Sequence, residues 1–161
     1  MAACGTGPAV HAPSPTGLAP TLKDRVHSVL EEAWAGYKTA FIEPDGRVID
    51  PTREGITTSE GQGYALLRAV WTGDQQVFDT VWHWTATNLQ TRGDGLFASL
   101  WSGGRVTDAN SASDADSDIA LALLYAARRF ATSALHGDAL RVLDAMWQSE
   151  VVSINGMNVL T

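Results

Sequence analysis

The sequence contains a single cysteine, Cys4, which excludes an internal disulfide framework. No apolar run approaches the ~20 residues that a transmembrane helix needs. Basic residues are also scarce: 11 lysines and arginines stand against 18 aspartates and glutamates, which gives a net charge of −7. This balance argues against nucleic acid or an anionic membrane as a partner and fits a protein whose substrate is neutral. With 161 residues, 45% of them hydrophobic, the chain can form one domain with a sizeable core.

Residues 1–20 are rich in proline, alanine, glycine and threonine, a composition typical of a flexible leader or linker. The stretch Ala2-Ala3-Cys4-Gly5 resembles the end of a bacterial lipoprotein signal, in which the cysteine carries the lipid. No charged and apolar segment precedes it, as an export signal requires. Two interpretations stay open: a start further upstream with a lipid anchor at Cys4, or a chance match. Residues 21–161 are expected to form the domain.

Helical periodicity begins at Leu22, where apolar residues recur every three or four positions as far as Phe41. Ser59 is positioned to cap a second helix, which Gly73 closes because glycine adopts the left-handed C′ conformation without penalty. Asp74 can cap the third helix, whose apolar side continues to Leu89. The intervening segments are rich in proline and glycine and are expected to be loops.

A fourth helix is expected from about Ser113 to Thr132. The pair Gly137-Asp138 repeats the punctuation of Gly73-Asp74, so it predicts the end of one helix and the start of another. Asn155-Gly156 suits the type I′ turn of a β-hairpin. Because the sequence shows no βαβ alternation, we predict an all-α fold of stacked helical hairpins. The terminal hairpin has no closing element after it, so we expect a chain truncated relative to a complete domain.

Three aspartates on alternate positions, Asp114, Asp116 and Asp118, match ligand positions one, three and five of an EF-hand loop. That loop needs glycine at position six and a bidentate glutamate at position twelve. Ile119 and Tyr125 occupy these positions, which excludes the calcium interpretation. The four histidines are scattered, so no zinc spacing exists either.

The aspartates also suit a helix start, where the macrodipole favours acids and Ser111 or Ser113 can supply a cap. A helix start explains one or two of these aspartates well but not all three, because Asp114 and Asp118 repel one another at i, i+4. The residues alone therefore leave a structural and a functional interpretation equally open.

A second candidate stretch surrounds Glu60, at the start of the second helix. Gly61 and Gly63 weaken this start by roughly 1 kcal/mol each relative to alanine. Such a cost is accepted where a ligand, or another helix, must approach closely. Trp101, in the loop between the two acidic stretches, could stack on a sugar. Two carboxyl groups, one of which donates a proton to the leaving oxygen, are what glycoside hydrolysis requires.

Together these stretches resemble glycoside hydrolase family 8, whose helix motif A-[ST]-D-[AG]-D-x-x-I-A is met from Ala112 to Ala120. The resemblance covers roughly residues 25–161 and rests on TSEGQGYALLRAVWTGDQQVFDTVWHWTATNL and ANSASDADSDIALALLYAARRF. It implies an (α/α)6 barrel, here truncated to about five helices. It also implies hydrolysis of internal β-1,4-glucosidic bonds of a cellulose-like polysaccharide with inversion, without a cofactor, by a secreted or periplasmic bacterial protein.

The resemblance also implies roles for individual residues. Glu60, in S-E-G-x-x-Y, matches the general acid, and Asp114 matches the aspartate that holds and distorts the sugar at the cleavage point. Tyr64, Trp101 and Asp116 are the substrate-binding candidates, with Asp116 expected to support Asp114. The water-activating base belongs to the second half of the family's barrel, which this chain lacks.

The remaining tryptophans occur at helical spacing and are expected in the core: Trp34, Trp71, Trp82, Trp84 and Trp147. Arg68 is one turn past Tyr64 and could face the cleft. A competing interpretation of the whole chain is a non-catalytic glucan-binding or structural helical module, in which the aspartates serve only as helix starts.

Overall fold

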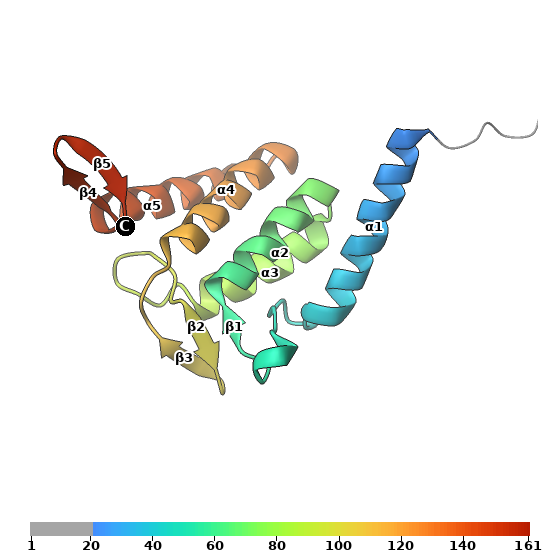
Figure 1. Cartoon of the computed structure of the whole chain (residues 1–161), viewed down its shortest axis with the longest axis horizontal. Coiled ribbons are helices and arrows are strands. Elements are labelled where there is room, and N and C mark those ends of the chain that lie inside the picture. Colours follow the sequence, from blue (N-terminus) through green and yellow to red (C-terminus); the bar gives the residue numbers. More distant parts are fainter. Residues whose placement is uncertain (1–20) are drawn as a thin grey trace, which may run out of the picture.

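The computed structural model describes residues 21–161; the leader with Cys4 lies outside the described residues. Within this range the chain forms five α-helices, which confirms the all-α prediction (Figure 1). None of these helices has the length and apolar character needed to cross a membrane. The helices are α1 (Leu22–Phe41), α2 (Ser59–Thr72), α3 (Gln75–Asn88), α4 (Ser113–Arg129) and α5 (Ser133–Ser149).

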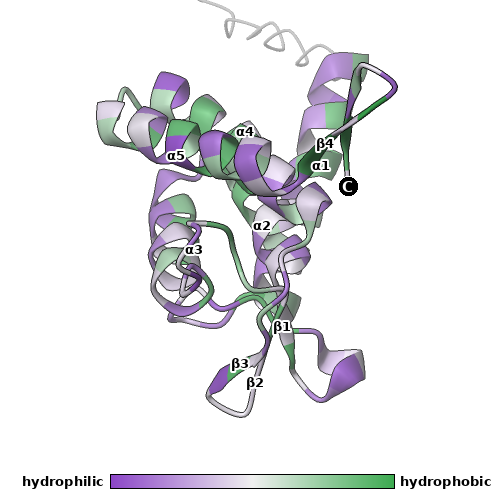
Figure 2. Cartoon of the chain, turned by 90° about the vertical axis from the view of Figure 1, so that its left-hand side faces the viewer, coloured by the Kyte–Doolittle hydropathy of each residue, from purple (hydrophilic) through white to green (hydrophobic). Residues whose placement is uncertain are grey.

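Helices α2 and α4 are the centre of the fold. They pack against one another, α3 covers α2, and α5 covers α4. A short helical turn, η1 (Pro51–Arg53), precedes α2, and a three-stranded antiparallel sheet lies at one end of the helices (Figure 2). Its strands are β1 (Thr57–Thr58), β2 (Leu100–Ser102) and β3 (Arg105–Asp108). Because β1 leads into α2 and β3 leads towards α4, both central helices begin at this sheet.

Small residues let α2 and α4 approach closely. Ala65 and Ala69 on α2, and Ala115 and Ala122 on α4, have no exposed surface. A Cβ on Gly63 would lie 3.3 Å from Asp118 Cβ and 3.5 Å from Ile119 Cγ1. Gly63 therefore serves tight helix contact, one of the two uses that its position in the sequence allowed.

The observed helix caps agree only in part with those predicted from the sequence. Gly73 has φ +80° and ends α2, and Asp74 Oδ1 accepts a 3.3 Å hydrogen bond from the Val77 amide, so both predictions are confirmed. The cap of α2 is Thr58 rather than Ser59, and its Oγ1 accepts from the Gly61 amide at 3.1 Å. The expected serine cap of α4 is wrong, because Ala112 occupies the N-cap position without a side-chain bond.

The prediction of a helix break at Gly137-Asp138 is also wrong, since α5 runs through both residues. The chain turns earlier, at Ala131, whose φ of +54° is left-handed. Asp138 forms an ion pair with Arg141 one turn further along the same helix instead of capping a new one.

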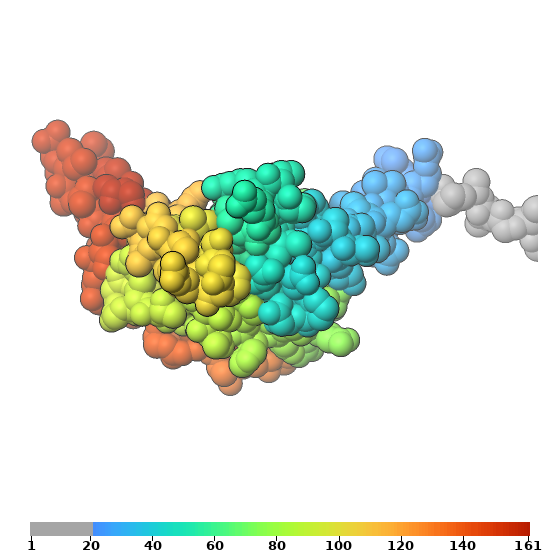
Figure 3. Space-filling view, turned by 90° about the horizontal axis from the view of Figure 1, so that it is seen from below, coloured from blue at the N-terminus to red at the C-terminus, as the bar shows by residue number. Residues whose placement is uncertain are grey.

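The loop expected between α3 and α4 contains the β2–β3 hairpin, which the sequence did not predict. The terminal hairpin was predicted: β4 (Val151–Ile154) pairs with β5 (Met157–Leu160). Its turn residues Asn155 and Gly156 have φ of +52° and +78°, as a type I′ turn requires. Viewed from below, this hairpin and α1 extend from opposite ends of the molecule (Figure 3).

Apolar burial is incomplete at these two ends. Trp34 is buried at 5% exposure, but Val26 and Leu30 on the same face of α1 are 50% and 57% exposed. Trp84 is in the core as expected, and the partly buried Trp82 packs against this core. The same prediction is wrong for two other tryptophans, Trp71 and Trp147, which are both 61% exposed.

Candidate active site

Glu60 and Tyr64 form a hydrogen-bonded pair on the exposed side of α2. The Tyr64 hydroxyl donates to Glu60 Oε1 at 2.7 Å, one helical turn away. Thr58 caps the helix just before Glu60, so the carboxylate stands in the first turn, where the helix dipole favours negative charge. Both side chains are exposed to solvent.

Two aspartates of α4 face this pair. The hydrogen bond and charge of Glu60 raise the pKa of the Tyr64 phenol, and Asp118 and Asp114 raise it further. Burial, followed by the charges of Asp114 and Glu60, raises the pKa of Asp118. The start of α4 therefore lies beside the start of α2, and the structure brings the predicted acid, the predicted sugar-holding aspartate and Tyr64 into one acidic cluster.

Within residues 21–161, no three histidine, cysteine, aspartate or glutamate side chains converge as a metal site would require. Asp114 is exposed, and its Oδ1 accepts a 2.9 Å hydrogen bond from the adjacent Ala115 amide. Its carboxylate is thus held at the helix start while remaining open to solvent.

A groove runs along α2 beside this cluster. One hollow of about 240 Å³ is lined by Glu60, Gly61 and the loop around Ile49, and an adjoining one of about 390 Å³ is lined by Arg68 and Asp118. Both hollows include Tyr37 of α1 and Tyr64 of α2, and we call them together the α2 groove. It is open to solvent and places aromatic rings and carboxylates along one path.

Three side chains of this groove were missed or only half recognised in the sequence. The Arg68 guanidinium lies 5.4 Å from the centre of the Tyr37 ring, facing the groove as its spacing from Tyr64 suggested. Tyr37 and Trp71 were assigned to apolar helix faces. Tyr37 lies beside the groove because α1 contacts α2, and a single sequence carries no signal for that contact.

Buried Gln62 fixes the loop that borders the groove. Its Oε1 accepts from the Val48 amide at 2.6 Å, and its Nε2 donates to Thr85 Oγ1 at 2.6 Å and to the Gly46 carbonyl at 3.3 Å. One side chain of α2 therefore holds both the preceding loop and α3. The sequence did not single out this residue.

Trp101 lies further from the acidic cluster. It is half-buried on β2 and pairs with Thr57, three residues before Glu60. The Arg47 guanidinium lies 4.9 Å from its ring centre, and Trp84 packs edge-on at 5.5 Å. Both the Arg47 charge and the Trp84 ring therefore compete with a sugar for contact with this indole, which lines neither hollow of the α2 groove.

Asp116 is not directed into the groove. It has no exposed surface, and its Oδ1 accepts a 3.0 Å hydrogen bond from the Phe97 amide on the opposite side of α4. A carboxylate in this position does not touch a sugar in the α2 groove. Two roles were expected of Asp116, contact with substrate and support of Asp114. Its burial fits only the second, because alternate positions at the start of a helix face different directions.

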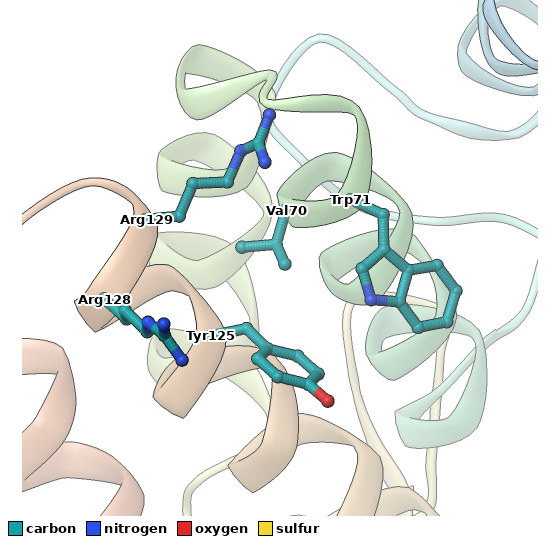
Figure 4. A pocket seen from close by; sticks show the side chains of 5 residues that line it. All are labelled: Val70, Trp71, Tyr125, Arg128 and Arg129. Carbon is teal, nitrogen blue, oxygen red and sulfur yellow. The ribbon is translucent and has the colours of Figure 1, made fainter. Parts of the chain in front are cut away.

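A separate hollow of about 410 Å³ lies at the other end of α2 and α4 (Figure 4). Trp71 and Val70 reach it from α2, and Tyr125, Arg128 and Arg129 from the last turns of α4. It contains no carboxyl group that could donate or accept the proton of a hydrolytic reaction. We therefore place the candidate active site at the acidic cluster and the α2 groove.

Comparison with known proteins identifies the family of the chain. The sequence matches the profile of glycosyl hydrolases family 8 over residues 14–161. A probable endoglucanase of Novacetimonas hansenii is 37% identical over 130 residues, covering 74% of this chain and 38% of the relative. An endoglucanase of Escherichia coli K12 is also 37% identical, over 78% of this chain and 36% of its own length.

Solved structures agree in fold. A family 8 endoglucanase from Klebsiella pneumoniae superposes with a TM-score of 0.77 and 34% identity over 80% of this chain and 43% of that one. An endo-β-1,4-glucanase from Acetobacter xylinum gives 0.78 and 33% over 84% and 43%. The chain thus spans less than half the length of these relatives, and its five helices correspond to part of their (α/α)6 barrel. The chain belongs to family 8 of the glycosyl hydrolases.

Proposed function

We propose that this chain supplies the proton-donating side of an endoglucanase that cleaves internal β-1,4-glucosidic bonds with inversion. The observation that carries the proposal is the acidic cluster, in which Glu60, Tyr64, Asp114 and Asp118 meet beside an open groove. The endoglucanase relatives support the substrate class, and a neutral glucan suits the net charge of −7.

In the proposed mechanism Glu60 protonates the leaving glycosidic oxygen. Its hydrogen bond from Tyr64 fixes one carboxyl oxygen, Oε1, and leaves the other free to face the substrate. Asp114, exposed at the start of α4, accepts hydrogen bonds from the sugar at the cleavage point and holds it in a distorted ring. This division of roles follows the requirement of an inverting enzyme for an acid on one face of the sugar and an activated water on the other.

The water-activating base is assigned to none of the residues above. Inverting enzymes place it ~6.5–9.5 Å from the acid. We propose that it comes from the second half of the barrel, which the relatives possess beyond the region matched here. Without a base the rate is expected to be lower by on the order of 10²–10⁴-fold.

The proposal is tested by the hydrolysis of carboxymethylcellulose, which is measured as the release of reducing ends. The chain is compared with Glu60→Gln, which keeps the shape of the side chain but cannot donate the proton in the same way. We expect slow hydrolysis by the chain and none above background by the variant. The first product should be the α-anomer, detected by proton NMR. Equal background in both proteins would exclude catalysis by this chain.

The competing function, glucan binding without hydrolysis, is distinguished by calorimetric titration with a cello-oligosaccharide. Tyr37→Ala, within the α2 groove, should weaken binding, while Tyr125→Ala, in the separate hollow, should not. Binding that depends on Tyr37 but is accompanied by no Glu60-dependent hydrolysis would favour the binding module.

A further inference from the structure

Two buried carboxyl groups meet on the side of α4 that faces away from the α2 groove. Asp116 has no exposed surface, and Glu150, which follows α5, is 4% exposed. Asp116 Oδ2 and Glu150 Oε2 are both buried without a hydrogen-bond donor among the described residues. Since buried polar atoms are almost always paired, two such atoms together require an explanation.

Glu150 acts on the pKa of Asp116 through both its charge and a side-chain hydrogen bond, which indicates that the two unpaired carboxyl groups face one another. Two ionised carboxylates cannot form that bond, because both are acceptors only; a proton on one of them supplies the donor. Burial raises the pKa of Asp116 to about 7, with further contributions from the charge and hydrogen bond of Glu150, against the opposing Phe97 amide and Arg92. This is the behaviour of two carboxyl groups that share one proton.

The charged neighbours of the pair come from the loop that precedes β2. Arg92 Nε donates to Asp94 Oδ1 at 3.0 Å, so most of its charge is already compensated by that carboxylate. On α4 itself, Asp114 and Asp118 flank Asp116 in sequence and add no positive charge. No cation is therefore free, among these neighbours, to neutralise both carboxylates of the pair.

We infer that Asp116 and Glu150 share a proton, and that this bond fixes the first turn of α4, making Glu150 a positioning residue for Asp114. The positioning part rests on the role proposed above for Asp114. The shared proton is expected in the folded chain without substrate.

The hydrogen bonds around the pair explain how it can fix the helix. Asp116 Oδ1 accepts from the Phe97 amide, which ties α4 to the loop. Glu150 is bound at its backbone: its amide donates to the Met146 carbonyl at 2.8 Å, and its carbonyl accepts from the Thr161 amide at 2.7 Å. The carboxyl pair thus joins the loop, α4 and the end of α5. It does so at a helix start that has no side-chain cap of its own.

The first test is the pH dependence of the Asp116 carboxyl, followed by carbon-13 NMR of labelled aspartate. We expect it to titrate near pH 7. Glu150→Gln should lower that pKa, because the variant removes the negative charge and its amide N–H can donate to Asp116 while Asp116 is ionised. Asp144→Asn, which removes an exposed carboxyl of α5, is the matched control and should leave it unchanged. Titration of Asp116 near its ordinary value of 3.8 would overturn the shared proton.

The second test is stability. A carboxyl whose folded pKa exceeds its unfolded value binds more protons in the folded state, so its contribution to stability is lost as pH rises between the two values. Asp116→Asn mimics the protonated acid, since its oxygen can accept from Phe97 and its amide can donate to Glu150. The folding equilibrium constant of the variant, relative to wild type, should rise by roughly tenfold or more between pH 4 and pH 7. An unchanged ratio overturns the inference.

The positioning role is tested at Asp114 directly. In Glu150→Ala the carboxyl-carbon chemical shift of Asp114 should change, and in Glu150→Gln it should return to the wild-type value because the bond is restored. A chemical shift of Asp114 that is identical in all three proteins would overturn the positioning role. None of these readouts involves a sugar, so their failure is distinguishable from failure of the proposed glucanase function.

Discussion

The Tyr64 hydroxyl is bound to the Glu60 carboxylate at 2.7 Å, and both residues stand on the same face of α2. The spacing of four residues places them one above the other, so the helix alone builds this pair. The neighbouring helix then adds Asp114 and Asp118 at a distance short enough to affect the Tyr64 phenol. The acid side of the candidate site is therefore assembled by the approach of two helix starts.

This relationship predicts a change in the ionisation of Tyr64. Glu60→Gln removes the largest causes of its raised pKa, so the phenol should ionise at a lower pH, closer to the ordinary tyrosine value of 10.0. The titration is measured by carbon-13 NMR of ring-labelled tyrosine. Asp79→Asn, an exposed aspartate of α3, is the charge-matched control and should have no effect. An unaltered Tyr64 titration in Glu60→Gln would contradict the pairing.

The contrast between two Gly-Asp pairs shows why helix boundaries could be predicted at one place and not at another. Asp74 is held from outside its helix: Trp34 Nε1 donates to it at 3.0 Å and Lys38 Nζ at 2.7 Å. Those contacts with α1 stabilise the turn that the dipeptide allows. Among residues 21–161, no other helix offers Asp138 such a partner; it pairs with Arg141, and α5 continues through it. The sequence signal is the same; tertiary contact decides.

The closeness of α2 and α4 predicts opposite effects for two glycine substitutions. Gly63→Ala places a methyl 3.3 Å from Asp118 Cβ and 3.5 Å from Ile119 Cγ1, which forces the two helices apart. The strain of about 1–3 kcal/mol should exceed the roughly 1 kcal/mol that alanine contributes in a helix.

Gly36→Ala on α1 is the control, because nothing lies within 4 Å of the added methyl. It should stabilise the chain by about 0.5–1 kcal/mol. Urea unfolding measures both variants. If Gly63→Ala proved as stabilising as Gly36→Ala, the close approach of the two helices would be wrong.

The sequence could single out Glu60, Tyr64 and Asp114 as candidates because their motifs are local: each is recognised from neighbours within a few positions. Tyr37 could not be found, since its place in the groove depends on the packing of α1 against α2. For Asp116 the sequence left both substrate contact and support of Asp114 open, because an alternate-residue pattern gives no direction until the helix is docked.

Buried Gln62 predicts a large loss of stability on substitution by an apolar residue. Gln62→Leu keeps the volume but removes the partner of the Val48 amide and of the Gly46 carbonyl. Each buried group left unpaired costs about 1–3 kcal/mol. Gln148→Leu, at an exposed position of α5, should change the free energy of unfolding by no more than about 0.5 kcal/mol. Comparable stability of the two variants in urea would contradict the role of Gln62.

The acidic cluster predicts that one of its own members opposes folding at neutral pH. Burial and the charges of Asp114 and Glu60 raise the pKa of Asp118 above the ordinary aspartate value of 3.8. The folded chain therefore holds this proton more tightly than the unfolded chain, and the contribution of Asp118 to stability falls as pH rises through the interval between the two values. Asp118→Asn removes the charge and should make the chain more stable than wild type at neutral pH, but not below pH 3.8.

The pH dependence of the difference in unfolding free energy between the two proteins measures this effect. Adding Glu60→Gln to both proteins should reduce the difference, because one of the repelling charges is already absent. A difference that does not change with pH, or one that Glu60→Gln leaves intact, would mean that the carboxylates of α2 and α4 do not interact. Reduction of the difference by Glu60→Gln would instead show that the two helix starts act as one electrostatic unit, which is the arrangement that the proposed proton donor requires.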